Sequence, residues 1–189
     1  MISDYIDSHL KTLSDLRESA EDISSMAAVC AKALQAGHKI LVCGNGGSAA
    51  DAQHFAAELV GRFVADRPAL AAIALTTDTS ALTAIANDYG YDAVFSRQVA
   101  GLAQAGDVLL AISTSGNSLS VLNACEQAAS MDCKVIGLTG RDGGALKAHC
   151  RNLVIAASND TAHIQEVHIV VIHLLCALIE AQLDWAALQ

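Results

Sequence analysis

Five short apolar segments alternate with segments of helical periodicity along most of this chain. The expected strands are residues 38–43, 71–75, 107–112, 134–138 and 152–156. The expected helices are residues 48–62, 79–87, 93–104, 118–131 and 161–185. Strands that are joined by helices pair in parallel and are covered on both faces. The pattern therefore predicts an α/β fold with three layers, built on a doubly wound, five-stranded parallel sheet.

Two further helices, residues 3–18 and 22–36, are expected before the first strand and lie outside the alternation. We expect them to pack on the sheet or on a neighbouring subunit. The chain has 189 residues and no linker-like stretch, which suits one domain. We predict a single domain over residues 1–189, with the N-terminal helices in 1–36 and the alternating core in 37–189.

The composition favours a compact domain that also buries surface in an oligomer. Hydrophobic residues make up 53% of the chain and mean hydropathy is +0.39. A membrane span is the competing explanation. The longest candidate, residues 164–179, is interrupted by polar side chains and is shorter than the ~20 apolar residues that a span needs. The first residues are acidic and lack the basic start of a secretory signal. We therefore predict no association with a membrane.

Charge and cysteine content narrow the function further. The formal net charge of −9 argues against nucleic-acid binding, which depends on Lys and Arg neutralising phosphates. It leaves a small anionic substrate possible, because a local loop can be electropositive. The six cysteines form no Cys-x-x-Cys pair. We interpret them as reduced, buried thiols of a cytoplasmic protein.

Two Gly/Ser-rich loops, each between an expected strand and an expected helix, point to a phosphorylated ligand. The first is Cys43-Gly44-Asn45-Gly46-Gly47-Ser48, and the second is Ser113-Thr114-Ser115-Gly116-Asn117-Ser118. Such loops offer hydroxyls and free N–H groups at the positive end of a helix, and this combination binds phosphate. The first loop is neither a Walker A nor a dinucleotide-binding motif. The alternatives are an ordinary tight turn for the first loop and simple helix capping for the second.

Polar residues on two expected helices are candidates for chemistry. His54 and Glu58 are four residues apart, so they share a helix face and can hold a divalent metal or act as an acid–base pair. Gln165, Glu166, His168 and His173 interrupt the apolar last helix, where polar groups need partners. Gln165 and His173 are ~12 Å apart along the axis. They either stretch toward one metal or serve sites completed by different subunits, and any of these histidines can be a satisfied core residue.

The chain resembles the sugar isomerase (SIS) domain family, and within it the phosphoheptose isomerases. The resemblance spans about residues 35–180. It is carried by the two loops already named, Asp51-Ala52-Gln53-His54-Phe55-Ala56-Ala57-Glu58-Leu59, Ala86-Asn87-Asp88-Tyr89-Gly90, Leu138-Thr139-Gly140-Arg141-Asp142-Gly143-Gly144, and Ile164-Gln165-Glu166-Val167-His168 with His173.

The resemblance implies a flavodoxin-like sheet and the interconversion of sedoheptulose 7-phosphate with D-glycero-D-manno-heptose 7-phosphate. That reaction begins the synthesis of ADP- or GDP-heptose for lipopolysaccharide or another surface glycan. It also implies a cytoplasmic homotetramer with active sites at subunit interfaces, and one zinc ion per subunit held by His54, Glu58, Gln165 and His173. The implied substrate-binding residues are Asn45, Gly46, Gly47, Ser48, Glu58, Asn87, Asp88, Ser113, Thr114, Ser115, Ser118 and Gln165.

Glu58 is the expected base of the enediol proton transfer, and His173 is expected to exchange protons at the sugar oxygens. One departure from the family is His163, which stands where its members usually carry Arg. Two other functions stay open. One is a non-catalytic SIS protein that binds the bacterial replication initiator, although that relative lacks counterparts of Glu58 and His173. The other is a sensor that binds a sugar phosphate without reacting.

Overall fold

The sheet is the centre of the computed structural model, which describes residues 1–188. Its five strands are all parallel, in the order β2-β1-β3-β4-β5. This is the flavodoxin-like order, so the predicted fold class is confirmed. The strands are β1 (Ile40–Gly44), β2 (Ala72–Ala74), β3 (Val108–Ser113), β4 (Lys134–Gly140) and β5 (Asn152–Ala156).

Seven α-helices surround this sheet within the described residues. They are α1 (Ile2–Asp15), α2 (Ala20–Gln35), α3 (Gly47–Val60), α4 (Thr79–Tyr89), α5 (Ser96–Leu102), α6 (Leu119–Ser130) and α7 (Thr161–Gln182). Short 3₁₀ turns occur at Leu16–Ser19, Tyr91–Ala93, Ala145–Ala148 and Trp185–Leu188. The first two predicted helices are thus joined by a 3₁₀ turn rather than by a loop, and the last helix ends three residues earlier than expected.

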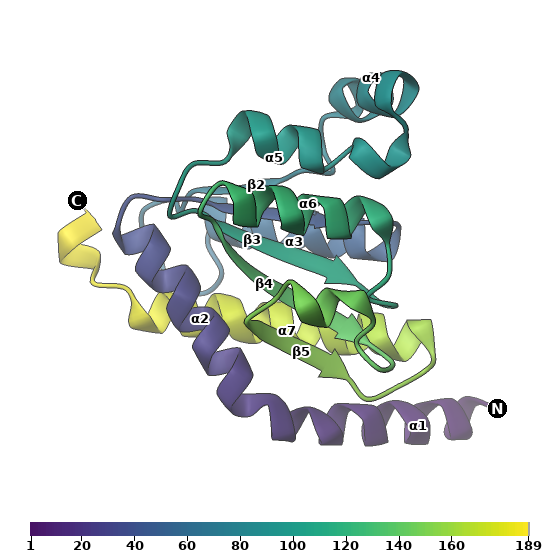
Figure 1. Cartoon of the computed structure of the whole chain (residues 1–189). Helices are drawn as coiled ribbons and strands as arrows, with labels where there is room; N and C mark the ends of the chain where they lie inside the picture. The colour runs from purple at the N-terminus through teal and green to yellow at the C-terminus, as the bar shows by residue number, and fades with distance from the viewer. Residues whose placement is uncertain (189) are drawn as a thin grey trace.

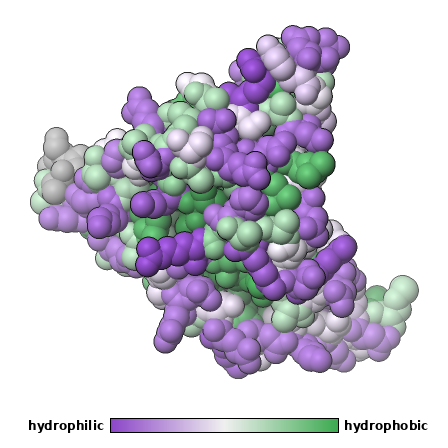
Figure 2. All heavy atoms as spheres, in the orientation of Figure 1, coloured by the Kyte–Doolittle hydropathy of each residue, from purple (hydrophilic) through white to green (hydrophobic). Residues whose placement is uncertain are grey.

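The helices divide between the two faces of the sheet, and each face has its own core. Along β1, Ile40 and Val42 join the core under α2, α3 and α7, whereas Leu41 and Cys43 join the core under α5 and α6. This alternation follows from the two-residue period of a strand. Figure 1 shows α6 along one face and α7 along the other, with α1 reaching out past β5. Figure 2 shows hydrophobic residues in the middle of the face seen there, between hydrophilic margins.

Helix α7 is long and apolar enough to span a membrane by length and composition alone. Its most apolar 18-residue window has a mean hydropathy of 1.8, and half of that window is buried inside the fold. The helix packs against α2 and α3 and contributes Val171, Ile172 and Leu175 to the core. These contacts are typical of a core helix. Such a helix is apolar because protein covers it, so its composition resembles that of a membrane span.

Candidate active site

The two Gly/Ser-rich loops lie side by side at the carboxyl edge of the sheet. Each follows one of the neighbouring strands β1 and β3, whose register pairs Gly44 with Ile112. In the order β2-β1-β3-β4-β5 the direction of the strand connections reverses between β1 and β3. The loops on either side diverge there and leave the crevice in which such folds bind ligands. The structure therefore brings both predicted loops to one ligand-binding position.

The first loop approaches α7 closely. A Cβ atom on Gly47 would lie 2.3 Å from Gln165 Nε2, so glycine is needed for the amide to pack there. Asn45 Nδ2 donates a hydrogen bond to Ser120 Oγ (3.0 Å), and Tyr91 Oη donates to Asn45 Oδ1 (2.8 Å). Asn45 thus connects the first loop to α6. The side chain of Gln165, a residue of α7, packs against the first residue of α3.

The second loop presents hydroxyls that are not used for capping. Ser118 is the N-cap residue of α6, yet its side chain makes no capping hydrogen bond. Instead Ser113 Oγ donates to Ser118 Oγ (3.3 Å), and Ser115 Oγ accepts from the Asn117 N–H (3.2 Å). Thr114 is half-buried between them. Since a cap would need only one of these hydroxyls, the cluster favours anion binding at the α6 N-terminus.

Three other predicted substrate residues are Ser48, at the end of the first loop, and Asn87 and Asp88, near the end of α4. Ser48 is buried in the first turn of α3. Asn87 and Asp88 are exposed in the last turn of α4, where Asn87 Nδ2 donates to Asp88 Oδ1 (2.8 Å). The chain runs directly from there to Tyr91, whose hydroxyl reaches Asn45. Tyr91 was not predicted as a site residue, since nothing in its local sequence shows that contact.

His54 is the central member of a chain of three polar side chains. Its Nε2 atom lies 3.2 Å from Glu58 Oε1 and 3.1 Å from His173 Nε2. The helix spacing of α3 places the first contact, and the packing of α7 against α3 places the second. Phe63 stacks on His173 with ring centroids 5.7 Å apart. The arrangement can hold or pass a proton among a carboxylate and two imidazoles.

Only part of this arrangement suits a zinc ion, because the three side chains do not offer three ligand atoms that all lie within 4.8 Å of one another. Zn–N distances of about 2.0–2.1 Å at tetrahedral angles put neighbouring ligand atoms about 3.3 Å apart. The 3.1 and 3.2 Å separations around His54 are close to that value, and nitrogen and carboxylate oxygen are usual zinc donors. Gln165 lies elsewhere. It packs on Gly47, seven residues before His54, or about 10 Å along the axis of α3. Within one chain the Gln165 amide thus lies at the first turn of α3, about two turns before His54.

Asp51 is a candidate that the sequence did not single out for a role. Burial raises the pKa of its carboxyl to about 6, an effect that the His54 charge partly offsets. Its Oδ2 atom is buried without a hydrogen-bond partner. Asp51 precedes His54 by about one helical turn, and this spacing could have marked it as a candidate in the sequence. A carboxyl with such a pKa beside the His54 chain can exchange protons near neutral pH.

A second group of possible metal ligands was also not predicted. It consists of His9, His163 and Glu166, whose ligand atoms all lie within 4.8 Å of one another. Among the described residues it is the one group of three His, Cys, Asp or Glu that meets this distance. It joins α1 to α7, away from His54.

Comparison with known proteins decides the family. The SIS domain matches residues 4–140. The chain belongs to the SIS family. A phosphoheptose isomerase of Helicobacter hepaticus is 55% identical over 182 residues, which are 96% of this chain and 93% of that protein. This SIS chain is also similar in structure to a phosphoheptose isomerase of Neisseria gonorrhoeae, with a TM-score of 0.90, 47% identity, and coverage of 95% of this chain and 97% of that one. A Francisella tularensis phosphoheptose isomerase gives a TM-score of 0.92 at 39% identity, covering 96% and 97%.

Proposed function

We propose that this chain is an aldose–ketose isomerase that converts sedoheptulose 7-phosphate to D-glycero-D-manno-heptose 7-phosphate, the first step toward ADP- or GDP-heptose for lipopolysaccharide or another surface glycan. The observation that carries the proposal is the Glu58–His54–His173 chain, in which Glu58 and His54 lie on α3, the helix that begins at the ligand crevice, and His173 lies on α7. The relatives named phosphoheptose isomerase, which match nearly the whole chain, supply the substrate class. We also propose that residues 1–189 act as one SIS domain; Gln189 lies outside the described residues.

The crevice supplies binding at one end of the substrate. The phosphate is held by the hydroxyls of Ser113, Thr114, Ser115 and Ser118 at the positive end of α6. The sugar chain extends toward the first loop, where Asn45, Gly46, Gly47, Ser48, Asn87, Asp88 and Gln165 offer amide, carboxylate and backbone groups. Binding at the phosphate end fixes where the reacting carbons lie, so its binding energy serves orientation.

Proton transfer is assigned to the histidine–carboxylate chain. Glu58 takes a proton from C1 of the ketose and returns it to C2, so that the carbonyl moves from C2 to C1 through an enediol. His54, which contacts Glu58, orients the carboxylate. His173 moves protons between the sugar oxygens, and the Phe63 ring that stacks on it limits its rotation.

We further propose one zinc ion per subunit, held by His54, Glu58 and His173, with Gln165 as a fourth ligand. A bound zinc ion would polarise the sugar carbonyl as a Lewis acid. Because Gln165 lies on Gly47 in its own chain, its contribution to this site is best met from a neighbouring subunit. A carboxylate bound to a metal would be a weaker base, so Glu58 would serve as the base when it is not coordinated.

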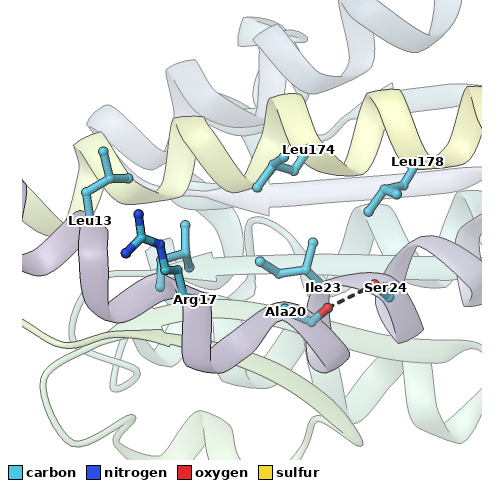
Figure 3. A pocket seen from close by; sticks show the side chains of 8 residues that line it. Leu13, Arg17, Ala20, Ile23, Ser24, Leu174 and Leu178 are labelled. Atoms are coloured by element: carbon cyan, nitrogen blue, oxygen red, sulfur yellow. Dashed lines mark hydrogen bonds between the residues drawn. The ribbon is translucent and has the colours of Figure 1, made fainter.

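A homotetramer with interfacial sites is the assembly that we propose. An apolar groove between α1, α2 and α7 supports it, because Leu13, Leu174 and Leu178 line an open surface there (Figure 3). Ile2, Ile6 and Leu10 of α1 are exposed as well. Contiguous apolar surface of this kind favours contact between subunits. The six cysteines are free, which suits the cytoplasm as the proposed location.

Turnover of sedoheptulose 7-phosphate by the purified protein tests this function. We expect aldose product from the wild type and from Glu21→Gln, whose carboxylate is exposed on α2. Chelation should reduce the rate, and added Zn²⁺ should restore it. Binding of the sugar phosphate without product would favour the sensor, and capture of the replication initiator without product would favour the non-catalytic protein.

A further inference from the structure

Three potential ligand atoms from two helices converge beside the N-terminal helix. Glu166 Oε2 lies 2.7 Å from His9 Nδ1 and 3.0 Å from His163 Nδ1. Tyr5 donates its hydroxyl hydrogen bond to the other carboxylate oxygen, Oε1, so Oε2 is left to the two imidazoles. His9 and Tyr5 belong to α1, while His163 and Glu166 belong to α7. The cluster therefore bridges two elements that are far apart in the sequence.

Hydrogen bonding accounts for only part of this cluster. His163 Nδ1 makes a hydrogen bond with Glu166 Oε2, but His9 Nδ1 does not, even though it is the nearer of the two. That His9 atom is buried and has no hydrogen-bond partner. The two atoms are thus close, but the angle at His9 Nδ1 does not allow a hydrogen bond to Glu166 Oε2. A buried nitrogen that faces a carboxylate oxygen without a hydrogen bond has the geometry of a ligand beside another ligand.

Glu166 is the charged member that a cation would need. Its Oε1 atom accepts from the Tyr5 hydroxyl, and its Oε2 atom accepts from His163 Nδ1. Its side chain is 36% exposed, against 25% for His9 and 3% for His163. The cluster can therefore be reached from solvent, through the open groove lined by Tyr5, Ile6 and His9.

We propose that His9, His163 and Glu166 form a second metal site, which takes a divalent transition metal such as Zn²⁺ and fastens α1 to α7. The donor set of two imidazole nitrogens and one carboxylate oxygen is one that zinc takes with water as a fourth ligand. Neighbouring ligand atoms in such a site are about 3.3 Å apart, so the 2.7 and 3.0 Å separations need to open by about 0.6 and 0.3 Å.

This site is separate from the one around His54. Gln165 and Glu166 are adjacent in sequence, but successive helical residues point about 100° apart. Gln165 faces Gly47 of α3, whereas Glu166 faces α1. The site serves attachment of α1, which buries only Thr12 among its own residues. A metal that binds the folded chain adds to its stability by mass action.

Titration with Co²⁺, followed by its visible absorption and by thermal unfolding, tests the proposal. The background is the His54→Gln/His173→Gln double variant, which removes the other histidine ligands. We expect one Co²⁺ per chain and a rise in melting temperature on binding. Adding His9→Gln should weaken binding by at least about 100-fold and abolish the rise, because a ligand is lost. His9 is partly exposed, so this substitution spares the core.

Matched changes keep the outcome decisive. His149→Gln removes a half-buried histidine outside the cluster and should leave Co²⁺ affinity unchanged. Equal Co²⁺ affinity with and without His9, or no saturable binding in the double variant, would overturn the proposal. If the double variant does not fold, metal content is counted in otherwise unaltered protein. His9→Gln should then hold one Co²⁺ fewer per chain, and an equal content would refute the site.

Discussion

Of the two histidines, only His54 contacts Glu58. Replacing the Glu58 carboxylate tests its proposed role as the base. Glu58→Gln keeps the size of the side chain but cannot accept a carbon-bound proton. We expect turnover of sedoheptulose 7-phosphate to fall by about 10²–10⁴-fold, the usual contribution of a general base. The affinity for the sugar phosphate, measured by calorimetry, should change little because we propose that the loop of residues 113–118 holds the phosphate. Near-normal turnover would contradict the role of Glu58.

His168 shows the opposite use of a histidine. It is fully buried, and its Nε2–H donates to the Thr139 carbonyl (3.0 Å). Burial lowers its pKa to about 4 from 6.5, although the bond to Thr139 opposes the shift. Between these values the unfolded chain binds a proton that the native protein does not, so the stabilising effect of a neutral His168 is complete above pH 6.5 and is lost as pH falls toward 4.

The corresponding prediction concerns His168→Gln. Its free energy of unfolding, measured with urea, should fall less between pH 7.5 and pH 5 than that of the wild type, by roughly 2 kcal/mol. All other titrating groups are shared, so the difference reports this histidine. An identical pH dependence in the two proteins would show that His168 does not titrate as its burial implies.

At the residue scale, the sequence indicated which side chains are candidates for the site, but it did not show which distant residues contact one another. The His54–Glu58 contact follows from helix spacing, and the structure has it. The burial of Asp51 and the bond from Tyr91 to Asn45 depend on chain segments that meet only in the folded protein. No local pattern around those residues carries that information.

The loop that enters α6 separates ligand binding from helix capping. Because the Ser118 side chain makes no capping bond, Ser118→Ala should cost well under the ~1 kcal/mol of a lost cap. It should raise KM for the sugar phosphate by about 10-fold, as expected for one lost hydrogen bond to a charged group. Steady-state kinetics and urea unfolding measure the two effects.

Asp78→Ala is the matched control for the stability part of that experiment. Asp78 does cap its helix, since its carboxylate accepts from the Ala81 N–H (2.9 Å). This variant should lose about 1 kcal/mol. A comparable loss of stability in Ser118→Ala, with KM unchanged, would mean that Ser118 is only a cap.

Gly116 shows why the second loop tolerates no side chain at its centre. Its φ is +67°, and a Cβ would lie 2.1 Å from the Gly143 carbonyl oxygen. Both the left-handed conformation and the backbone contact oppose any larger residue. We expect Gly116→Ala to lower the free energy of unfolding by about 2–3 kcal/mol, measured by urea unfolding. A loss under half that size would mean that the loop relaxes easily.

Element positions were the most predictable level of this fold. Apolar runs bounded by Gly and Ser gave each of the five strands to within two residues at either end. Helix ends were less certain, because the 3₁₀ turn at Leu16–Ser19 continues the helical pattern of α1 in sequence. The strand order came from the resemblance, since alternation alone is compatible with more than one doubly wound order.

For the whole molecule, the separation of Gln165 from His173 leads to a test of shared sites. If each site takes Gln165 from one subunit and His173 from another, two inactive variants can complement each other. We expect Gln165→Ala and His173→Ala to be inactive alone and to recover up to about a quarter of wild-type activity when refolded together at equal amounts. Sedimentation of each variant should show the same assembly. Inactivity of every mixture would place all ligands in one chain.

At the scale of the whole molecule, local sequence patterns did not predict which helices pack against each other. The approach of α3 to α7 brings His54 to His173 across 119 residues, and the approach of α1 to α7 brings Tyr5 to Glu166 across 161. Helix periodicity shows that such helices have apolar faces, but it does not show which faces meet. The resemblance implied the first pairing, and nothing in the chain signalled the second.

The most direct test follows hydrogen during the reaction. The wild type is incubated with sedoheptulose 7-phosphate in deuterated water, and the aldose product is examined by NMR. Proton transfer by Glu58 through an enediol predicts deuterium at C2 of the product, from exchange of the carboxyl proton with solvent, and none in sugar incubated with Glu58→Gln. Turnover that leaves C2 free of deuterium, or undiminished deuterium uptake with Glu58→Gln, would contradict the mechanism.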